Sequence, residues 1–315
     1  MLKRLGCYFH EDKQRYVVPS EPTIRRIIQS QDSETIEPVL NGWIKRLNLE
    51  QTDDDAIAVD GKVLKGAHDS QGHQTHLLSA VLHEQATTVA QVKIDSKSNE
   101  IPSVSTLLDP LDISDRVITF DALHTQRKTA KYLVEDKKAY YFFTVKGNQP
   151  TLKADIELLN LTQTPPDHET VEKGHGRIET RRIWTSTALN NYLDAPIVKQ
   201  VCCIQRHVFD CKSIPEREET VYGITALTPS QANPKRLLKL NRGHWSIENR
   251  SHYVRDVTFN EDNSQIRTGS GPQVMACLRN FAVGTLRVVK NVTNVASALR
   301  DMAAKPHRAL ELIGL

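Results

Sequence analysis

Two apolar runs that each end in an aspartate constrain the fold of this chain most. One is Ala56-Ile-Ala-Val-Asp60 and the other is Arg116-Val-Ile-Thr-Phe-Asp121. A carboxylate at the end of a buried strand costs desolvation energy unless a cation or hydrogen bonds compensate it. The segment between the runs is long enough for a right-handed crossover, which returns the second strand parallel to the first. The pattern therefore predicts a sheet with Asp60 and Asp121 side by side at one edge.

The surrounding pattern predicts a mixed α/β sheet of the ribonuclease-H-like type. Short polar links at 69–72 and 83–85 favour antiparallel hairpins between the first three strands. Longer helical segments separate the later strands, as parallel pairing requires. The expected strands are 56–63, 76–82, 87–94, 116–120 and 139–145, and the expected helices are 20–29, 36–47, 101–111 and 125–136.

Past residue 161 the pattern changes to long β-like runs. A linker rich in threonine and proline begins at Thr162, and the runs are 169–171, 177–184, 197–206 and 219–227. We therefore expect a β-rich subdomain inserted into the core. The predicted divisions are the end of a helical N-terminal region at 1–55, a catalytic core at 56–161 and 228–265, the insertion at 162–227 and a helical basic tail at 266–315.

A third acid, Glu248, lies in the polar helical stretch Arg242–Asp256. Two strand-end acids and a third on a helix form a ligand set for a pair of Mg²⁺ ions, which bind carboxylate oxygens and support phosphodiester chemistry. His244, His252 and Arg255 follow α-helical spacing from Glu248, so we expect all of them on its face. There the Arg255 guanidinium is expected to meet a phosphate next to the metals.

Each acid also has a simpler interpretation. Asp60 precedes a glycine and suits a turn, Asp121 suits a helix cap, and Glu248 alone suits a solvated helix surface. What favours a joint site is that all three acids converge in one topology. The histidines on the third segment have no cysteine at metal spacing, so the pattern disfavours zinc.

Polar residues near the acids are candidates for DNA contact. They are Lys62, Lys65, His124, Lys146, Asn148, Arg177, Arg242, His244, His252 and Arg255. Lys62 and Lys65 either contact phosphates or merely flank a strand. His124 either orients substrate or caps the next helix, and Arg177 either clamps a DNA end or belongs to a simple β-turn.

Charge alone does not decide whether the chain binds nucleic acid. The net charge is only +3, yet the C-terminal third is rich in basic residues: Arg242, Arg250, Arg255, Arg267, Arg279, Arg287, Lys290, Arg300, Lys305 and Arg308. Such a face suits a polyanion, and a solvated helix surface explains it equally well.

Several features predict a cytoplasmic protein without a membrane partner. The sequence has no apolar stretch near the roughly 18 residues of a membrane span. Its N-terminus lacks the apolar core of a signal peptide. The adjacent Cys202 and Cys203 lie in an apolar run without CxxC spacing, so we expect reduced, buried thiols.

The acids lie within longer blocks that resemble the H-repeat-associated DDE transposases of bacterial insertion sequences. Further matching blocks are Phe142–Gln149, His175–Glu179 and Asp256–Asp262, and the resemblance runs from about Leu5 to Leu286. It implies a DNA transposase whose three acids hold two Mg²⁺ ions, with Mn²⁺ as a substitute. The implied partners are the terminal repeats and the target duplex, and the implied assembly is a homodimer on DNA, associated with the nucleoid.

The chain departs from this resemblance in two places. Family members have a longer helical region before Arg15–Pro22, so this chain is expected to start inside it. In related transposases an arginine and a tyrosine precede the glutamate, whereas Asn241 and His244 stand here. Two alternatives therefore stay open: a stand-alone metal-dependent nuclease, and a non-catalytic DNA-binding remnant that regulates transposition.

Overall fold

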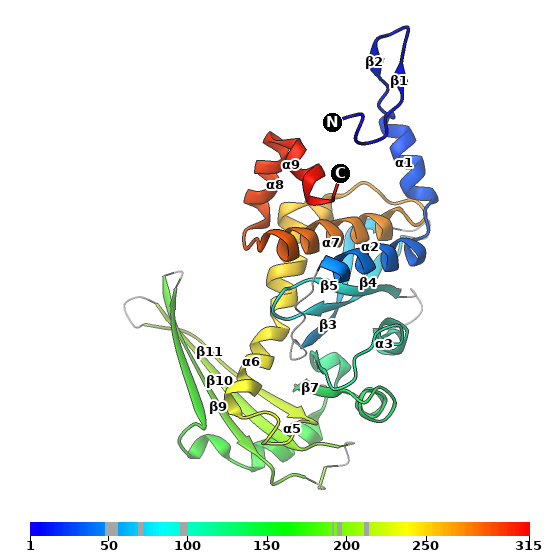
Figure 1. Ribbon diagram of the computed structural model, residues 1–315. Coiled ribbons are helices and arrows are strands. Elements are labelled where there is room, and N and C mark those ends of the chain that lie inside the picture. Colours follow the sequence, from blue (N-terminus) through cyan, green and yellow to red (C-terminus); the bar gives the residue numbers. More distant parts are fainter. Residues whose placement is uncertain are drawn as a thin grey trace. The chain divides into compact units, whose positions relative to one another are not determined.

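The chain divides into two units, each with its own hydrophobic core (Figure 1). The first unit comprises Met1–Thr52, Gly61–Asn99 and Ile247–Leu315, and the second comprises Asp53–Asp60 and Glu100–Ser246. The computed structural model describes residues 1–47, 56–68, 72–94, 100–174, 176–190, 192–193, 197–210 and 214–315. The expected catalytic core, 56–161 with 228–265, is thus divided between the two units.

Three parallel strands form the centre of the second unit. The first residues of β3 (Ile57–His68) pair with β6 (Val117–Phe120), which pairs with β7 (Tyr140–Val145). All four residues of β6 are buried, as expected for a parallel strand covered on both faces. The connecting helical segments are α3 (Glu100–Leu108), the turn η1 (Ala122–His124), α4 (Arg127–Lys131) and the π-helical turn η2 (Tyr132–Asp136).

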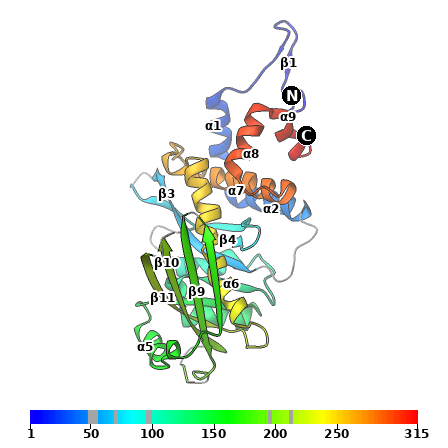
Figure 2. The same ribbon diagram turned by 90° about the vertical axis from the view of Figure 1, so that its left-hand side faces the viewer.

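The inserted strands continue this sheet. They are β8 (His168–Gly174), β9 (Arg177–Ser186), β10 (Gln200–Asp210) and β11 (Pro215–Thr225), and the last three lie side by side in Figure 2. Consecutive inserted strands pair antiparallel, and β11 pairs antiparallel with β7. The strand order in this unit is β3-β6-β7-β11-β10-β9-β8, so β8 is an edge strand.

Helix α6 (Pro234–His244) covers the second unit's sheet. It begins where the Asn233 side chain accepts a hydrogen bond from the Arg236 amide, with a proline in the first turn. Its leucines, Leu237 and Leu238, are buried in one cluster with residues of β9 and β10. A further helix, α5 (Pro150–Leu158), packs on β10 and was not predicted; the short turn η3 (Leu161–Gln163) follows it.

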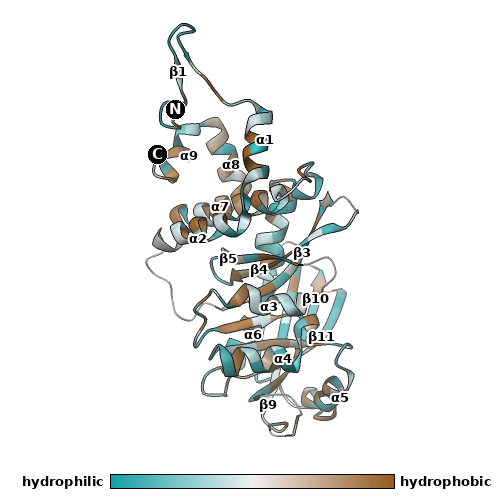
Figure 3. Cartoon of the chain, turned by 90° about the vertical axis from the view of Figure 1, so that its right-hand side faces the viewer, coloured by the Kyte–Doolittle hydropathy of each residue, from teal (hydrophilic) through white to brown (hydrophobic). Residues whose placement is uncertain are grey.

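The first unit combines three strands with a helical layer. Its strand order is β5-β4-β3, with β4 (Gln74–Leu82) antiparallel to β5 (Thr88–Ile94). Helices α2 (Ser33–Leu47) and α7 (Gly271–Lys290) lie side by side (Figure 3) and both contact β5. A glycine permits this close approach, because a Cβ at Gly284 would lie 2.8 Å from Cδ1 of Ile44.

The two ends of the chain also belong to the first unit. At the N-terminus, the hairpin of β1 (Phe9–His10) and β2 (Arg15–Tyr16) precedes α1 (Glu21–Ser30). At the C-terminus, α8 (Val295–Ala304) and α9 (Pro306–Leu312) pack on α7. Leu286 of α7 and Val295 of α8 are buried in one cluster, on which Val254 and Phe259 also pack.

The strand order and directions confirm the predicted ribonuclease-H-like α/β class. The region after α6 differs from the continuous helix that the sequence suggested. It consists of two π-helical turns, η4 (Ile247–His252) and η5 (Val254–Thr258), followed by the 3₁₀ turn η6 (Glu261–Asn263). A π turn bonds each residue to the fifth one along, so side chains at α-helical spacing no longer share a face.

Candidate active site

Asp60 and Asp121 lie at neighbouring positions of two parallel strands. The last pair in the register of β3 and β6 is Val59 with Phe120, and each aspartate comes one residue later. Adjacent strands lie about 4.8 Å apart, and paired positions point to the same side of a sheet. Both aspartates are half-buried. The second unit by itself therefore brings together two of the three predicted acids.

The loop after Asp121 is tied to the loop after β7. The Asp121 carboxylate accepts a hydrogen bond from the Leu123 amide at 2.9 Å, so it caps the turn η1. Asn148 donates its side-chain amide to the Ala122 carbonyl at 2.5 Å, and Gln149 donates to the Thr125 carbonyl at 2.8 Å. These bonds fix the backbone around Asp121. They also occupy Asn148, for which a DNA contact was predicted.

Lys146 is the exposed cation of this loop. It follows the last residue of β7, and its Nζ lies 5.5 Å from the centroid of the Trp245 ring. An ammonium above an indole is held by the ring's quadrupole while it stays accessible to solvent. Lys146 is thus placed at the same sheet edge as Asp121, with its charge available to an anion.

Two buried histidines, His124 and His244, lie beneath the sheet edge that carries Asp121. His124 is fully buried, and its ring lies 5.1 Å from the Phe120 ring. His244 Nδ1 lies 3.1 Å from the Thr119 hydroxyl, and burial lowers the pKa of His244 to about 4, although the Asp121 charge opposes the shift. His244 is therefore neutral at pH 7. Its burial counts against the DNA contact predicted for it, and desolvation disfavours the imidazolium.

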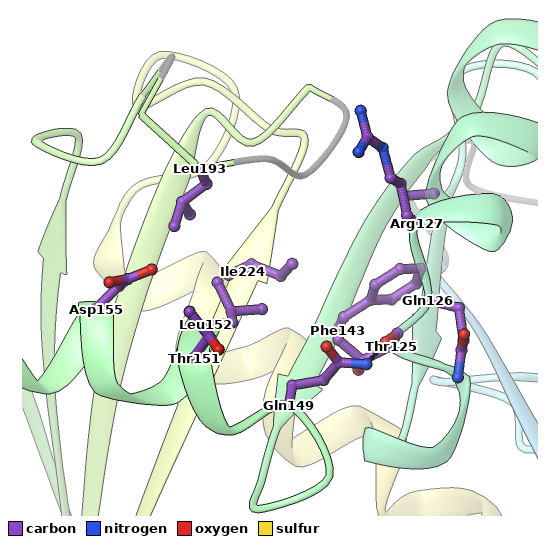
Figure 4. A pocket seen from close by; sticks show the side chains of 11 residues that line it. Thr125, Gln126, Arg127, Phe143, Gln149, Thr151, Leu152, Asp155, Leu193 and Ile224 are labelled. Carbon is purple, nitrogen blue, oxygen red and sulfur yellow. Dashed lines mark hydrogen bonds between the residues drawn. The ribbon is translucent and has the colours of Figure 1, made fainter.

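A pocket of about 200 Å³ opens beside the same loop (Figure 4). Arg127 and Asp155 lie on opposite sides of it, with Phe143 and Ile224 between them. Thr125 and Gln149, which are joined by the hydrogen bond described above, also line it. The sequence did not indicate this pocket, since its walls come from five separate segments.

Glu248 belongs to the first unit and lies exposed in the π-helical turn η4. Its neighbours at α-helical spacing, His252 and Arg255, are both buried. The three side chains therefore do not share one face, and that prediction is wrong because the backbone is π-helical here. Burial lowers the pKa of His252 to about 3, with help from the charge of Arg255, so His252 is also neutral at pH 7.

Arg255 is the centre of a buried polar network instead of a phosphate ligand. Its side chain is 1% exposed, and its Nε donates to Glu261 at 2.8 Å. The other oxygen of Glu261 accepts from Arg279 at 2.9 Å. Gln91 of β5 and Asn280 of α7 complete the network, with the Gln91 side-chain oxygen 3.2 Å from Arg255. The predicted contact between Arg255 and phosphate is wrong, since no part of the guanidinium reaches the surface.

The lysines that follow Asp60 are held by acids of the segment Asp256–Asp262. Lys62 is buried and lies 2.5 Å from Asp256, and Lys65, which is 70% exposed, lies 2.7 Å from Asp262. These ion pairs fasten β3 to the segment that follows Glu248. Lys62 is thus held in a buried ion pair, whereas most of the Lys65 side chain is exposed to solvent.

The arginines of the predicted basic tail divide in the same way. Arg279 and Arg287 are buried, and Arg287 donates to the carbonyls of Ala86 and Arg250. Arg250 and Arg267 are exposed, although each donates to a backbone carbonyl. The polyanion-binding face that the sequence suggested for the C-terminal third therefore does not include Arg279 or Arg287, because each is enclosed by partners of its own unit.

Of the other two predicted DNA ligands, Arg177 lies in the insertion and Arg242, on α6, pairs with it. Arg242 donates both terminal nitrogens to Glu172, at 2.5 and 2.7 Å. Arg177, at the start of β9, is 47% exposed and lies 3.7 Å from Glu179. His175, quoted for the resemblance, lies outside the described residues.

The donor chemistry of the aspartates suits hard divalent cations. Within the part of the chain that the structure describes, no group of three or more His, Cys, Asp or Glu side chains is placed to hold a metal ion. Asp60 and Asp121 nevertheless offer carboxylate oxygens from neighbouring strand ends, and Mg²⁺ takes one or two such ligands together with water and phosphate. Both residues therefore fit that role.

Several residues of this region were missed by reasoning from the sequence. Thr144 is one position past Phe143, which pairs with Phe120 in the register of β6 and β7, so it extends the row of Asp60 and Asp121. The acids Asp256, Glu261 and Asp262 had no assigned role. In the sequence, these acids were marked only by having the opposite charge to lysines and arginines far away along the chain. One sequence does not show which of these charges form ion pairs.

Comparison with known proteins shows the family. The family described as "Transposase DDE domain" matches residues 51–283. "Putative transposase YncI" of Escherichia coli O157:H7 is 31% identical over 298 residues, which cover 91% of this chain and 75% of that relative. "H repeat-associated putative transposase YhhI" of Escherichia coli strain K12 is 28% identical over 283 residues, covering 85% and 73%.

A solved structure of the piggyBac transposase synaptic complex with hairpin DNA aligns with a TM-score of 0.46 and 13% identity. The alignment covers 90% of this chain and 59% of that one. Among the described residues, none of the helices combines the length and the apolar character needed to cross a membrane.

Proposed function

The chain belongs to the family of transposase DDE domains, and on that premise we propose that it cuts DNA at the ends of an insertion sequence and joins them to a target. The observation that carries the proposal is the register of β3 and β6, which sets Asp60 beside Asp121 at one sheet edge. Carboxylates in that position serve phosphodiester chemistry when they bind divalent cations.

In this proposal Asp60, Asp121 and Glu248 hold two Mg²⁺ ions, for which Mn²⁺ substitutes. Bound there, the ions would supply charge neutralisation at the phosphate and acidify the attacking hydroxyl. The hydroxyl is that of water in cleavage and the DNA 3′-hydroxyl in strand transfer. Its oxygen forms a bond to phosphorus as the bond to the leaving oxygen breaks; its proton passes to solvent, and the leaving oxygen takes up a proton from solvent.

The other residues of the edge support the two aspartates. The capping bond from the Leu123 amide holds the Asp121 carboxylate, and the Asn148 bond to Ala122 holds its loop. His244 stays neutral beneath them, so it does not compete for the carboxylates as a cation. Lys146 and Lys65, both exposed, are the cations that we propose to contact DNA phosphates.

The test measures DNA cleavage and joining with duplexes that carry the element's ends, in Mg²⁺ or Mn²⁺. We expect Asp60→Ala, Asp121→Ala and Glu248→Gln each to abolish both products. The matched control is Glu135→Gln, which removes an exposed acid whose ion pair, among the residues that the structure describes, is with Lys131 at 3.6 Å. It should retain full activity, because exposed pairs of this kind contribute little.

Each result has a distinct meaning. Cleavage by the Asp60 and Asp121 variants at the parent's rate would refute the assignment. Nicking without joined products would favour a stand-alone nuclease. Binding of Mn²⁺, followed by electron paramagnetic resonance, gives a readout besides activity: it should weaken in the aspartate variants and not in Glu135→Gln.

A further inference from the structure

One face of the inserted sheet carries an excess of arginine. Side chains two apart on a strand share a face, and the register aligns Thr170, Arg181 and Arg206 in one row across β8, β9 and β10. The guanidinium cluster on this face consists of Arg177, Arg181, Arg206 and Arg242, with the acids Glu172 and Glu179 among them. Glu219 of β11 also pairs with Arg206 at 3.6 Å and with Arg217 of its own strand at 3.3 Å, so the ion-pair network of this face holds five arginines and three glutamates and has a net positive charge.

Glu179 holds the base of the cluster together. It is buried on β9, and its carboxylate pairs closely with Arg181 and Arg206 and lies 3.7 Å from Arg177. Burial raises its pKa, but the hydrogen bond from Arg206 and the charges of the three arginines outweigh burial and lower it. Glu179 is therefore a permanent anion of the structure, and one carboxylate is shared by three guanidinium groups.

Arg181 is the most buried cation of the cluster. Its side chain is only 15% exposed, and its Nη1 is buried without a hydrogen bond among the residues that the structure describes. Burial lowers the pKa of Arg181, and the nearby charge of Arg242 lowers it further. The buried Nη1 therefore still has the capacity to donate to a further oxygen acceptor.

Glu172 occupies that site from an exposed position. It lies on the edge strand β8 and its side chain is 49% exposed. One of its oxygens lies 3.7 Å from Arg181 Nη1, and the two terminal nitrogens of Arg242 donate hydrogen bonds to both oxygens. A guanidinium fork binds carboxylate and phosphate oxygens in the same geometry. The Glu172 carboxylate thus stands where a phosphate would fit.

We propose that a phosphate of the DNA backbone displaces the Glu172 carboxylate and binds between Arg242 and Arg181. Glu172 then acts as an internal competitor that DNA must release. The displacement requires little structural change, because the glutamate is exposed on an edge strand and only its side chain has to turn away. The inference rests on the proposed function for its source of phosphate, and it assigns the DNA path to the insertion.

The chain contains a matched control between the same two strands. Glu169 of β8 and Arg182 of β9 form an ion pair at 2.5 Å. Arg182 is adjacent to Arg181, so it points to the opposite face of the sheet. Substitutions in this pair change the net charge by the same amount as substitutions in the cluster, but they leave the cluster intact.

The experiment measures the affinity of the full chain for duplex DNA as a function of salt, with EDTA present so that no cleavage occurs. We expect Glu172→Gln to bind more tightly than Glu169→Gln, because only the first removes the competitor. Arg242→Gln should bind more weakly than Arg182→Gln, with a log–log salt slope less steep by about 0.9, the value for one lost phosphate contact.

Equal effects of the two glutamate variants would overturn the inference, because the gain would then reflect net charge alone. Titration with inorganic phosphate tests the other source: binding that depends on Arg242 while DNA affinity stays insensitive to it would also overturn the DNA assignment. A parent chain that binds no DNA would instead refute the proposed function. Circular dichroism of each variant checks that the sheet is folded.

Discussion

Burial decides which arginines of this chain can meet a polyanion. Arg255, Arg279 and Arg287 have the charge for it, yet all three are buried and paired within the first unit. A guanidinium that already has carboxylate or carbonyl partners in a dry interior gains nothing from phosphate. At the residue scale, charge in the sequence therefore overstates the DNA-binding surface of the C-terminal third.

The acid Glu261 is expected to be essential for stability. It accepts from both Arg255 and Arg279 while 2% exposed, so Glu261→Gln leaves two buried cations with little compensation. Breaking such a buried pair costs about 3–5 kcal/mol. Denaturant unfolding should show this loss, whereas Asp301→Asn, which breaks an exposed pair with Arg308, should change the free energy of unfolding by less than about 1 kcal/mol.

Equal stabilities of the two variants would mean that the buried network is dispensable. The same reasoning predicts how substitutions at Arg279 and Arg287 act. They should lower the free energy of unfolding, and the salt slope of DNA binding by the folded fraction should stay that of the parent.

Among the elements, β3 is the strand whose residues are divided between the two units. Its early residues carry Asp60 in the second unit, and its later residues lie against the segment after Glu248 in the first. Lys62 and Lys65 fasten it through ion pairs, and Arg267 donates to the Gly66 carbonyl at 2.9 Å. The strand is thereby held along its length by the segment 256–267.

Gly66 permits this close approach. A Cβ there would lie 2.5 Å from the Ser264 carbonyl oxygen and 2.8 Å from that of Asp262. Both are backbone atoms that cannot rotate away, so Gly66→Ala should cost about 1–3 kcal/mol of unfolding free energy. Gly42→Ala is the control in the same unit: it lies within α2 with nothing within 4 Å, and alanine there should stabilise by up to about 1 kcal/mol.

Thermal unfolding of both variants checks the signs. A melting temperature for Gly66→Ala at or above that of the parent would show that the segment 262–264 moves aside freely. Such a result would remove the argument that β3 is held tightly along its length.

For the whole molecule, buried neutral histidines predict acid sensitivity in both units. Burial lowers the pKa to about 4 for His244 in the second unit and to about 3 for His252 in the first. Because the folded pKa lies below the ordinary value of 6.5, the stabilisation is complete above pH 6.5. It is lost as pH falls towards 4 and 3, by about 1.4 kcal/mol per unit of pKa difference.

Glu37 gives the opposite dependence of stability on pH. Burial raises its pKa to about 7, so its contribution is complete below its ordinary value of 4.5 and is lost as pH rises through 7. We therefore expect the stability of the parent to fall as pH drops below 6.5, with the Glu37 contribution offsetting part of that loss between pH 7 and 4.5. Hydrogen exchange at each pH resolves the two units: His244→Gln should flatten the acid loss in the second unit, and His252→Gln in the first.

His307→Gln, at an exposed position, is the control and should leave both profiles unchanged. An acid loss of the same size in His244→Gln as in the parent would show that another group is responsible in that unit.

The sequence by itself determined the strand-end aspartates and the fold class. Apolar runs, hairpin links and crossover lengths are local properties, and local properties are enough to order β3, β6 and β7 and to set Asp60 beside Asp121. The antiparallel runs of the insertion were also readable, since each strand alternates along its own length.

Only the tertiary structure decided which charges are exposed and which are enclosed. Lys62 meets Asp256 across 194 positions of sequence, and Arg255 meets Gln91 across 164. The energy of such contacts depends on desolvation and on partners from distant segments, neither of which leaves a local pattern. The π-helical turns around Glu248 likewise had no signal in the sequence, and the predicted common face was lost with them.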